Sequence, residues 1–247
     1  MTGGNRGIGL GMTKGLVAAG CNVAIWARDQ RRNAEAVAEC SKWPGRAEAF
    51  VCDVTDPHSI ENALEETTAF FGAIDGLFAN AGIGGGGRVP FLEQSDEAWA
   101  RLLEVNVMGT KRSIAAVLQR MVEQSQDGRA GGRIVATSSV AANKGTAFNQ
   151  HYAAAKSAIV SLTRSIAVEF ARYSITANAI LPGYTATEMV EDLAENERFM
   201  TAMKPRLPLR RLGSIDDFAG IAIYLMSDLS RYHTGDAITI DGGFFVA

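Results

Sequence analysis

A tyrosine and a lysine lie four residues apart in the segment NQHYAAAKSAIVSLTRSIAVEF, residues 149–170. If this segment is helical, Tyr152 and Lys156 share one face, so that the phenol and the ammonium can approach each other. A free phenol has a pKa near 10 and is a poor acid or base at neutral pH. An ammonium about 4 Å away, at an effective dielectric constant near 20, would stabilise the phenolate by about 4 kcal/mol and lower the phenol's pKa by about three units. The pair therefore predicts general acid–base chemistry.

The alternative is a tyrosine and a lysine that share a helix face without any chemical role. Ser139 weighs against this alternative, because its hydroxyl lies thirteen residues before the tyrosine, at the end of a strand-like segment. The three side chains together favour a catalytic site.

A glycine-rich loop opens the chain, in the stretch MTGGNRGIGLGMTKGL. Its pattern is Thr2-Gly3-x-x-x-Gly7-Ile8-Gly9, and a helical pattern follows. Glycines let the backbone turn sharply and approach a pyrophosphate, and the helix N-terminus adds the positive end of its dipole. The loop therefore predicts a phosphate-binding turn, with a flexible terminus as the alternative.

The strand that should precede this loop is absent from the sequence. In a doubly wound sheet that strand is central, and its loss would leave two rows of backbone groups unpaired. The free-energy cost of losing this strand would exceed the net stability of a domain, which is roughly 5–15 kcal/mol. We therefore expect about 8–12 upstream residues, ending in an apolar run, to belong to the native protein.

Short apolar segments alternate with helical patterns along the chain. This order predicts an α/β fold with a parallel sheet covered by helices on both faces, forming one dinucleotide-binding and catalytic domain over residues 1–247. The expected strands are 22–27, 47–54, 74–79, 133–139, 174–180 and 237–241, and the main expected helices are 31–42, 57–71, 95–123 and 150–172.

Polar or glycine-containing segments follow several of these strands. In such folds, ligands bind beyond the carboxyl ends of the strands. The segments are Arg28 after the first strand, Asp53 after the second, Asn80 to Gly82 after the third, Ser138 and Ser139 after the fourth, and 181–183 after the fifth. We expect them to converge on one cleft.

Composition excludes several classes of function. The 247 residues carry a net charge of −3, which gives no support for nucleic-acid binding. No apolar run reaches the roughly 18 residues that would span a membrane. The cysteines Cys21, Cys40 and Cys52 share no metal-binding spacing, and neither do the three histidines. We therefore expect no metal site and a cytoplasmic location.

The motifs TGGNRGIG, NAG, LEVNVMG, ATSS, YAAAK and LPGYTATEM, in this order, resemble the short-chain dehydrogenase/reductase family. The resemblance extends over essentially the whole chain and ends with HTGDAITIDGG, residues 233–243. It implies a single-domain Rossmann fold, a nicotinamide cofactor and four catalytic residues. It also implies a homotetramer that assembles through the helices at 95–123 and 150–172.

The resemblance assigns a role to each catalytic residue. Tyr152 is the general acid/base for a ketone or alcohol oxygen, and Lys156 lowers the phenol's pKa and holds the nicotinamide ribose. Ser139 hydrogen-bonds the substrate oxygen, whereas its neighbour Ser138 is structural. Asn106 anchors a water molecule that links Lys156 to solvent.

The resemblance also implies the cofactor contacts. Asp53 meets the adenine ring, the segment 80–82 lines the adenine ribose, and Thr187, with Thr185 as the second choice, meets the carboxamide. The full set of cofactor-binding residues is Gly3, Asn5, Arg6, Gly7, Ile8, Gly9, Arg28, Asp53, Val54, Asn80, Ala81, Gly82, Tyr152, Lys156, Pro182, Gly183, Thr185 and Thr187.

The end of the first expected strand bears on the choice between NADP(H) and NAD(H). An acid there would bind the ribose 2′-hydroxyl, whereas an arginine would accept a 2′-phosphate. Here Ala27 stands where the family's acid would be, with Arg28 beside it and Arg6 in the glycine loop. Asp29 argues for NAD(H), but it also suits a helix N-cap. NADP(H) is the favoured cofactor, and NAD(H) is the alternative.

The implied reaction is reversible hydride transfer between NADP(H) and a ketone or secondary alcohol. Similar chains include 3-oxoacyl-acyl-carrier-protein reductases and gluconate-type sugar-acid dehydrogenases, and the segments NAILPGYTATEM, RLPLRRLG and YHTGD favour the second. A substrate lid is expected at about 184–212. The alternative is a catalytically idle NADP-sensing regulatory protein of the same fold, which would be expected to lack an intact tyrosine–lysine pair.

Three weaker features have two interpretations each. His151, beside the tyrosine, is expected in the core or in solvent rather than at the substrate. The segment GIGGGGRVP, residues 82–90, is either a wall of the substrate pocket or a plain connection. The basic segment 204–213 either attracts an acidic substrate or, as we favour, forms a solvated surface.

Overall fold

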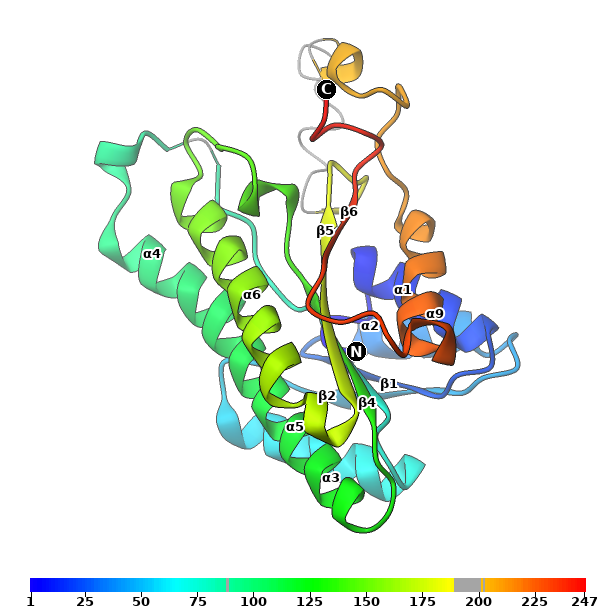
Figure 1. Cartoon of the computed structure of the whole chain (residues 1–247). Coiled ribbons are helices and arrows are strands. Elements are labelled where there is room, and N and C mark those ends of the chain that lie inside the picture. Colours follow the sequence, from blue (N-terminus) through cyan, green and yellow to red (C-terminus); the bar gives the residue numbers. More distant parts are fainter. Residues whose placement is uncertain (88, 189–200, 202) are drawn as a thin grey trace.

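The computed structural model describes residues 1–87, 89–188, 201 and 203–247. Within them, parallel strands form the centre of the molecule (Figure 1). The strands are β1 Val23–Ala27, β2 Ala47–Val51, β3 Gly76–Ala79, β4 Gly132–Thr137, β5 Ile175–Pro182 and β6 Ala237–Ile240. Strand β1 pairs with β2, and β3, β4, β5 and β6 pair in that order, each pair being parallel.

Helices connect the strands. The α-helices are α1 Gly7–Ala18, α2 Gln30–Cys40, α3 Pro57–Phe71, α4 Asp96–Leu103, α5 Thr110–Gln126, α6 Gln150–Glu169 and α9 Ala219–Met226. Short 3₁₀ helices are η1 Phe91–Glu93, η3 Val140–Ala142, η4 Ala171–Tyr173, η6 Lys204–Arg206, η7 Ile215–Phe218 and η8 Asp228–Ser230, and a π-helical turn, η2, spans Glu104–Gly109. Helices α4, α5 and α6 lie on one side of the sheet, and α1 and α9 lie on the other (Figure 1).

Two hydrophobic cores lie on opposite faces of the sheet. Successive side chains of a strand point to opposite faces. Accordingly, Trp26 and Ile134 pack into one core with α3, α5 and α6, whereas Ile25 and Val135 pack into the other with α1, α2 and α9. Burial on both faces explains why the strands are apolar in unbroken runs. The predicted α/β fold with a parallel sheet is confirmed.

Two helical features differ from the sequence prediction. The helix expected over 95–123 is divided into α4, η2 and α5, and the π-helical turn lies where Gly109 packs against Val54. Helix α9 was not predicted, because its sequence AGIAIYLM is apolar almost throughout and shows no helical period.

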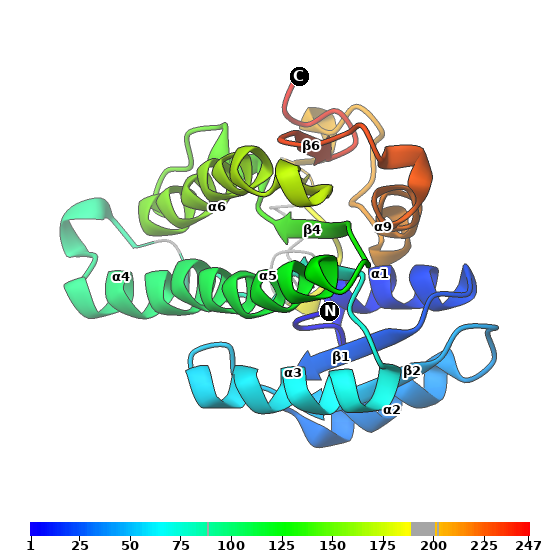
Figure 2. The same ribbon diagram turned by 60° about the horizontal axis from the view of Figure 1, so that its bottom comes forward.

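The first residues occupy the position of a central strand. Thr2 forms parallel bridges with Trp26 of β1 and Ala79 of β3. The backbone N–H of Trp26 donates to Met1 O at 2.9 Å, and the N–H of Thr2 donates to Phe78 O at 3.0 Å. Figure 2 shows the N-terminus inside the molecule, next to β1. Within the described residues, this short segment connects β2 and β1 to the other four strands.

A cavity of about 350 Å³ adjoins the buried N-terminus. Its lining includes the facing edges of β1 and β3. It also includes the apolar side chains of Leu16, Leu77, Val117 and Met226. The Met1 ammonium donates to Ala24 O at 2.8 Å, and burial lowers its pKa from 8.0 to about 5. The cavity therefore lies directly beside the buried ammonium.

In a polypeptide that begins with a free amino group at Met1, the burial of this group predicts a pH-dependent stability. Between about pH 5 and 8, the unfolded chain holds a proton at Met1 that the folded chain lacks. The free energy of unfolding should therefore rise with pH across this window, by up to about 4 kcal/mol. Urea unfolding at pH 5.5, 6.5 and 7.5 measures the slope. The same chain acetylated at Met1 has no titrating amine and serves as the control, and equal slopes for the two forms would contradict the prediction.

Candidate active site

The turn before α1 presents free backbone N–H groups. Helix α1 begins at Gly7, and its N-cap residue Arg6 makes no side-chain hydrogen bond to the first turn. First-turn N–H groups have no partner within a helix, and with the helix dipole they favour an anion. The loop packs closely on the helix, because a Cβ at Gly9 would lie 2.2 Å from the carbonyl oxygen of Gly3. These features fit the pyrophosphate of a dinucleotide.

The ends of β3 and β4 are tied to this turn. Thr2 Oγ1 accepts hydrogen bonds from the backbone N–H groups of Asn80 and Ala81, both at 2.9 Å. The Asn80 Nδ2 donates to Gly3 O at 3.4 Å, and its Oδ1 accepts from Thr137 Oγ1 at 3.1 Å. The Asn80 side chain, which the sequence assigned to the adenine ribose, therefore braces the glycine loop.

Two other predicted cofactor residues of the loop also point inward. The Asn5 side chain is buried and donates to Asn33 Oδ1 at 2.8 Å, and Asn33 Nδ2 donates to Ala27 O at 3.0 Å. Ile8 packs on the core formed with α1, α2 and α9. The hydrogen bond of the Asn5 amide nitrogen and the packing of Ile8 hold these two side chains against the protein. No periodic pattern in the sequence links Asn5 to Asn33, so this hydrogen bond could not be predicted.

The tyrosine–lysine pair lies on one face of α6, as predicted. The Lys156 Nζ lies 5.6 Å from the centre of the Tyr152 ring and donates to Thr137 O at 2.9 Å. Lys156 is buried, whereas Tyr152 is half-buried. The helix therefore brings the phenol and the ammonium together at the end of β4.

The predicted lowering of the tyrosine's pKa is wrong for the described structure. Burial raises the pKa of Tyr152 above its ordinary value, and a hydrogen bond with Ser139 offsets part of that rise. Burial also lowers the pKa of Lys156 from 10.5 to about 8. Withdrawal of both groups from water thus outweighs their attraction, since the lysine is bound to Thr137 O rather than to the phenol oxygen. At neutral pH Tyr152 is a neutral phenol, the form that donates a proton.

The two adjacent serines have different partners. Ser138 is buried, and its Oγ donates to the backbone oxygen of Lys156 at 2.7 Å, which is a structural contact. Ser139 Oγ accepts from the backbone N–H of Ala141 at 3.1 Å, at the start of η3, and Ser139 also hydrogen-bonds Tyr152. The structure therefore brings Ser139, and not Ser138, to the phenol.

Asn106 lies in the π-helical turn η2, a feature often found at functional sites. Its Oδ1 accepts from the backbone N–H of Ile83 at 2.8 Å, and its Nδ2 donates to Ile83 O at 2.9 Å. Gly82 lies between Asn106 and the lysine, because a Cβ there would be 3.0 Å from Asn106 Oδ1 and 3.6 Å from Lys156 Nζ. The segment after β3 is thus fixed against Lys156.

Charged side chains gather at the ends of β1 and β2. Arg28 Nη1 lies 3.5 Å from Asp53 Oδ2, and the two side chains are 69% and 36% exposed. The Asp53 carboxylate also accepts from the backbone N–H and hydroxyl of Thr55. Val54 is buried against η2 and offers no side-chain atom to a ligand. Asp29 caps α2 by accepting from the backbone N–H of Arg32, as expected.

Arg32 is a site residue that the sequence prediction missed. Its Nη1 donates to Glu188 Oε1 at 2.5 Å, and Arg6 Nη1 donates to the other oxygen of Glu188 at 3.2 Å. The signal in the sequence was the spacing of four residues from Arg28 to Arg32, across the first turn of α2. Three arginines therefore lie around the region where the sequence predicted a 2′-phosphate.

The segment after β5 crosses the glycine loop. The backbone N–H of Gly183 donates to Ile240 O, next to Pro182 at the end of β5. Thr185 is buried, and its Oγ1 donates to Gly183 O at 3.2 Å. By contrast, the Thr187 methyl lies 3.5 Å from the position of a Cβ at Gly7. Thr187 rather than Thr185 therefore faces the predicted cofactor site. The remainder of the predicted lid at 189–200 and 202 lies outside the described residues.

The loop after β3 is attached to α6 next to Tyr152. His151 is buried, and its Nε2 donates to Gly85 O at 3.1 Å. The ring centres of His151 and Trp99 are 5.8 Å apart. The expectation of a core position for His151 agrees with this burial, and its role is to hold the glycine-rich loop beside α6.

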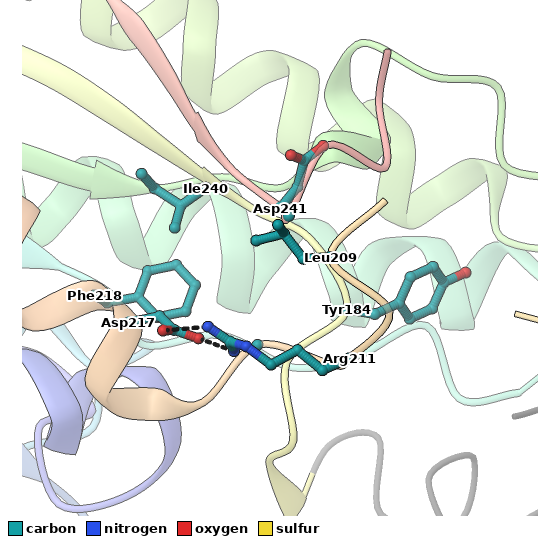
Figure 3. Close-up of a pocket in the computed structure, with 9 residues that line it drawn as sticks. Tyr184, Leu209, Arg211, Asp217, Phe218, Ile240 and Asp241 are labelled. Atoms are coloured by element: carbon teal, nitrogen blue, oxygen red, sulfur yellow. Dashed lines mark hydrogen bonds and ion pairs between the residues drawn. The ribbon is translucent and has the colours of Figure 1, made fainter. Parts of the chain in front are cut away.

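A pocket of about 210 Å³ lies near the carboxyl ends of β5 and β6. Figure 3 shows Arg211 pointing toward Asp217 along this pocket, with Tyr184 at the opposite end. The two arginine–carboxylate hydrogen bonds are 2.5 and 2.9 Å long and lower the pKa of Asp217 to about 2. The charge of Arg211 is therefore balanced by Asp217 within the protein. This pairing agrees with segment 204–213 forming a solvated surface rather than attracting an acidic substrate.

Solved structures match this arrangement closely. A short-chain type dehydrogenase/reductase from Mycobacterium marinum is 34% identical with a TM-score of 0.91, covering 99% of this chain and 93% of that one. A gluconate 5-dehydrogenase from Burkholderia cenocepacia, in complex with NADP and tartrate, is 32% identical with a TM-score of 0.91, covering 100% and 94%. The chain belongs to the short-chain dehydrogenase/reductase family. Its Rossmann fold and the resemblance noted in the sequence are thereby confirmed.

The names of proteins with similar sequences include several different substrates. A family described as enoyl-(acyl carrier protein) reductase matches residues 3–245. An L-rhamnose 1-dehydrogenase (NAD(P)(+)) from Azotobacter vinelandii is 36% identical, covering 100% of this chain and 95% of that protein. A 3-oxoacyl-[acyl-carrier-protein] reductase from Escherichia coli is 32% identical, covering 100% and 96%. The chain is therefore an NAD(P)-dependent oxidoreductase that acts on alcohol or ketone groups.

Two other kinds of feature, a membrane-spanning helix and a metal site, have no candidate in the part of the chain that the structure describes. No described helix combines the length and the apolar character that crossing a membrane requires. Among the described residues, no three His, Cys, Asp or Glu side chains could together hold a metal ion.

Gly82 supplies a test of the site's geometry. Gly82→Ala should lower turnover by about tenfold or more, because the new methyl would displace Asn106 and shift the segment beside Lys156. Gly220→Ala in α9 is the matched control, since nothing lies within 4 Å of its Cβ position. Steady-state rates and melting temperatures of both variants are compared with the unmodified chain. Unchanged turnover in Gly82→Ala would contradict the described packing.

Proposed function

We propose that the chain, as one catalytic domain over residues 1–247, transfers a hydride reversibly between NADP(H) and a ketone or secondary alcohol. The observation that carries the proposal is the group of Tyr152, Ser139 and Lys156 at the end of β4. The phenol hydrogen-bonds Ser139, and the ammonium lies 5.6 Å from the phenol ring.

The residues present fit a nicotinamide dinucleotide. The uncapped N-terminus of α1 would hold the pyrophosphate, and Gly82 leaves the end of β3 open toward Lys156. Thr187 lies over Gly7 and would meet the carboxamide end. When bound, the nicotinamide supplies or accepts the hydride.

The chain's own residues would handle the proton. In reduction, the neutral phenol of Tyr152 donates its proton to the carbonyl oxygen, and in oxidation the phenolate takes the alcohol proton. Ser139 hydrogen-bonds the same oxygen and stabilises the charge that develops on it. Lys156, which keeps most of its positive charge at neutral pH, favours the phenolate that remains after donation.

After donation, a new proton would reach Tyr152 through the buried polar groups around Lys156. Lys156 Nζ donates to Thr137 O, and Asn106 lies on the far side of Gly82 from the lysine. We assign Asn106 the positioning of this segment, through both backbone groups of Ile83. The water relay that the resemblance implies would use the same region.

The preference for NADP(H) over NAD(H) rests on arginines. Arg28 directly follows β1, and Arg32 in the first turn of α2 shares Glu188 with Arg6. A guanidinium binds a phosphate in a bidentate manner. Asp29, the acid that favoured NAD(H), is used as the N-cap of α2. The arrangement therefore supports the 2′-phosphorylated cofactor.

For the substrate, we propose a sugar acid or polyol first and a 3-oxoacyl thioester second. A gluconate 5-dehydrogenase and an L-rhamnose 1-dehydrogenase are among the similar proteins, as is a 3-oxoacyl-acyl-carrier-protein reductase. NADPH oxidation against a panel of ketones, sugar acids and oxoacyl thioesters decides between the two. The idle-regulator alternative has no support, because the tyrosine, lysine, serine and asparagine are all present.

We also propose a cytoplasmic homotetramer. Cys21, Cys40 and Cys52 are unpaired, which suits a reducing compartment. Val168 on α6 is 82% exposed, and an exposed apolar side chain on this helix suits an interface along α5 and α6. Sedimentation of the purified chain measures the number of subunits.

The proton-transfer role predicts the effect of two substitutions. Tyr152→Phe should lower turnover by about 10²–10⁴-fold, and Ser139→Ala by about 10²–10³-fold, without loss of NADPH binding. The readouts are absorbance of the reduced nicotinamide for turnover and fluorescence titration for binding. Tyr173→Phe, in η4 after α6, is the matched control. Turnover within twofold of the unmodified chain in Tyr152→Phe would overturn the mechanism.

The cofactor preference predicts a selective loss of affinity. Arg28→Ala should weaken NADPH binding by about tenfold and leave NADH binding unchanged, because only the first cofactor carries the 2′-phosphate. Arg31→Ala is the control, since Arg31 is bound to Glu35 on the exposed side of α2. Unchanged NADPH affinity in Arg28→Ala would contradict the role of Arg28.

A further inference from the structure

Glu188 binds two arginines that come from different parts of the chain. Its Oε2 lies 3.2 Å from Arg6 Nη1, and its Oε1 lies 2.5 Å from Arg32 Nη1. Arg6 is the N-cap of α1, Arg32 belongs to the first turn of α2, and Glu188 follows β5. One carboxylate thus bridges two guanidinium groups, with one oxygen on each.

This bridge lies next to the anion-binding turn. Arg6 immediately precedes Gly7, where the free N–H groups of α1 begin. Thr187, the neighbour of Glu188, lies over Gly7. The carboxylate therefore lies between two arginines at the edge of the predicted cofactor site.

The bridge is accessible and fully charged. The side chains of Arg6, Arg32 and Glu188 are 55%, 31% and 48% exposed. The hydrogen bond from Arg32 holds the pKa of Glu188 below its ordinary value, so that the carboxylate stays ionised at neutral pH. An incoming anion can reach these arginines, but it has to compete with a permanent negative charge. Two oxygens of a phosphate monoester match the two oxygens of the carboxylate in both charge and bonding.

We propose that Glu188 is an internal counter-ion of the Arg6–Arg32 pair, which a ribose phosphate monoester displaces on binding. The inference rests on the proposed preference for NADP(H) and adds a residue that sets its strength. Glu188 lowers the affinity for the phosphate-bearing ligand and leaves the affinity for its unphosphorylated counterpart unchanged. Displacement also breaks the charged contacts that Glu188 makes with Arg6 before α1 and with Arg32 in α2.

The test uses two small probes that lack the nicotinamide. Adenosine 2′,5′-bisphosphate carries the 2′-phosphate, and adenosine 5′-monophosphate does not. Their affinities for the full chain are measured by calorimetry at low and at moderate salt. Glu188→Gln should tighten the bisphosphate by about threefold to tenfold at low salt and leave the monophosphate within twofold. The gain should shrink as salt rises.

Two further variants isolate the contact from a general change in charge. Glu35→Gln is the matched control, because Glu35 is exposed on α2, is bound to Arg31 and loses the same charge. It should leave both affinities within twofold. In an Arg32→Ala background, Glu188→Gln should gain less than twofold. An equal gain in Glu35→Gln, or a full gain without Arg32, would show a long-range charge effect and overturn the proposal.

The outcome separates this inference from the cofactor preference. If the unmodified chain binds the bisphosphate no more tightly than the monophosphate, but Glu188→Gln does, the counter-ion is established and the proposed preference for NADP(H) falls. If the unmodified chain prefers the bisphosphate and Glu188→Gln leaves that preference unchanged, the counter-ion role falls and the cofactor preference stands. If neither form distinguishes the probes, both proposals fall.

Discussion

The active site depends on the hydrogen bonds of one buried threonine. Thr2 bridges Trp26 of β1 and Ala79 of β3, and its Oγ1 accepts from the backbone N–H groups of Asn80 and Ala81. Each such bond contributes only about 1 kcal/mol, but an unpaired buried N–H costs about 1–3 kcal/mol. The glycine loop and the end of β3 are therefore fixed relative to each other before any ligand binds.

The sequence predicted the fold and the catalytic group because both follow from local patterns. Apolar segments of four to eight residues alternate with helical periods, and this alternation determines a parallel sheet. Parallel strands end at one edge, so residues directly after them, such as Asn80 and Ser139, had to converge. Tyr152 and Lys156 are four residues apart, so a helix alone is enough to place them on the same face. The family resemblance then assigned each residue a role.

Other features depended on partners far away in the chain. Arg32 and Glu188 are 156 residues apart, and no periodicity links them. Asn5 was assigned to the cofactor, although its amide is engaged by Asn33. The spacing of Tyr152 and Lys156 predicts a lowered phenol pKa, whereas burial, which spacing does not reveal, is the largest cause and raises it. Sequence spacing indicates which groups can meet but does not measure how much water surrounds them.

The two serines at the end of β4 have a consequence for how the enzyme loses its activity on heating. Ser138 is bonded to the backbone of Lys156, and Ser139 to the side chain of Tyr152. The end of β4 thus contacts α6 at two points about one helical turn apart, one of them buried and the other half-buried. The acid, its hydrogen-bond partner and the core melt as one cooperative unit, so thermal inactivation should coincide with global denaturation rather than precede it.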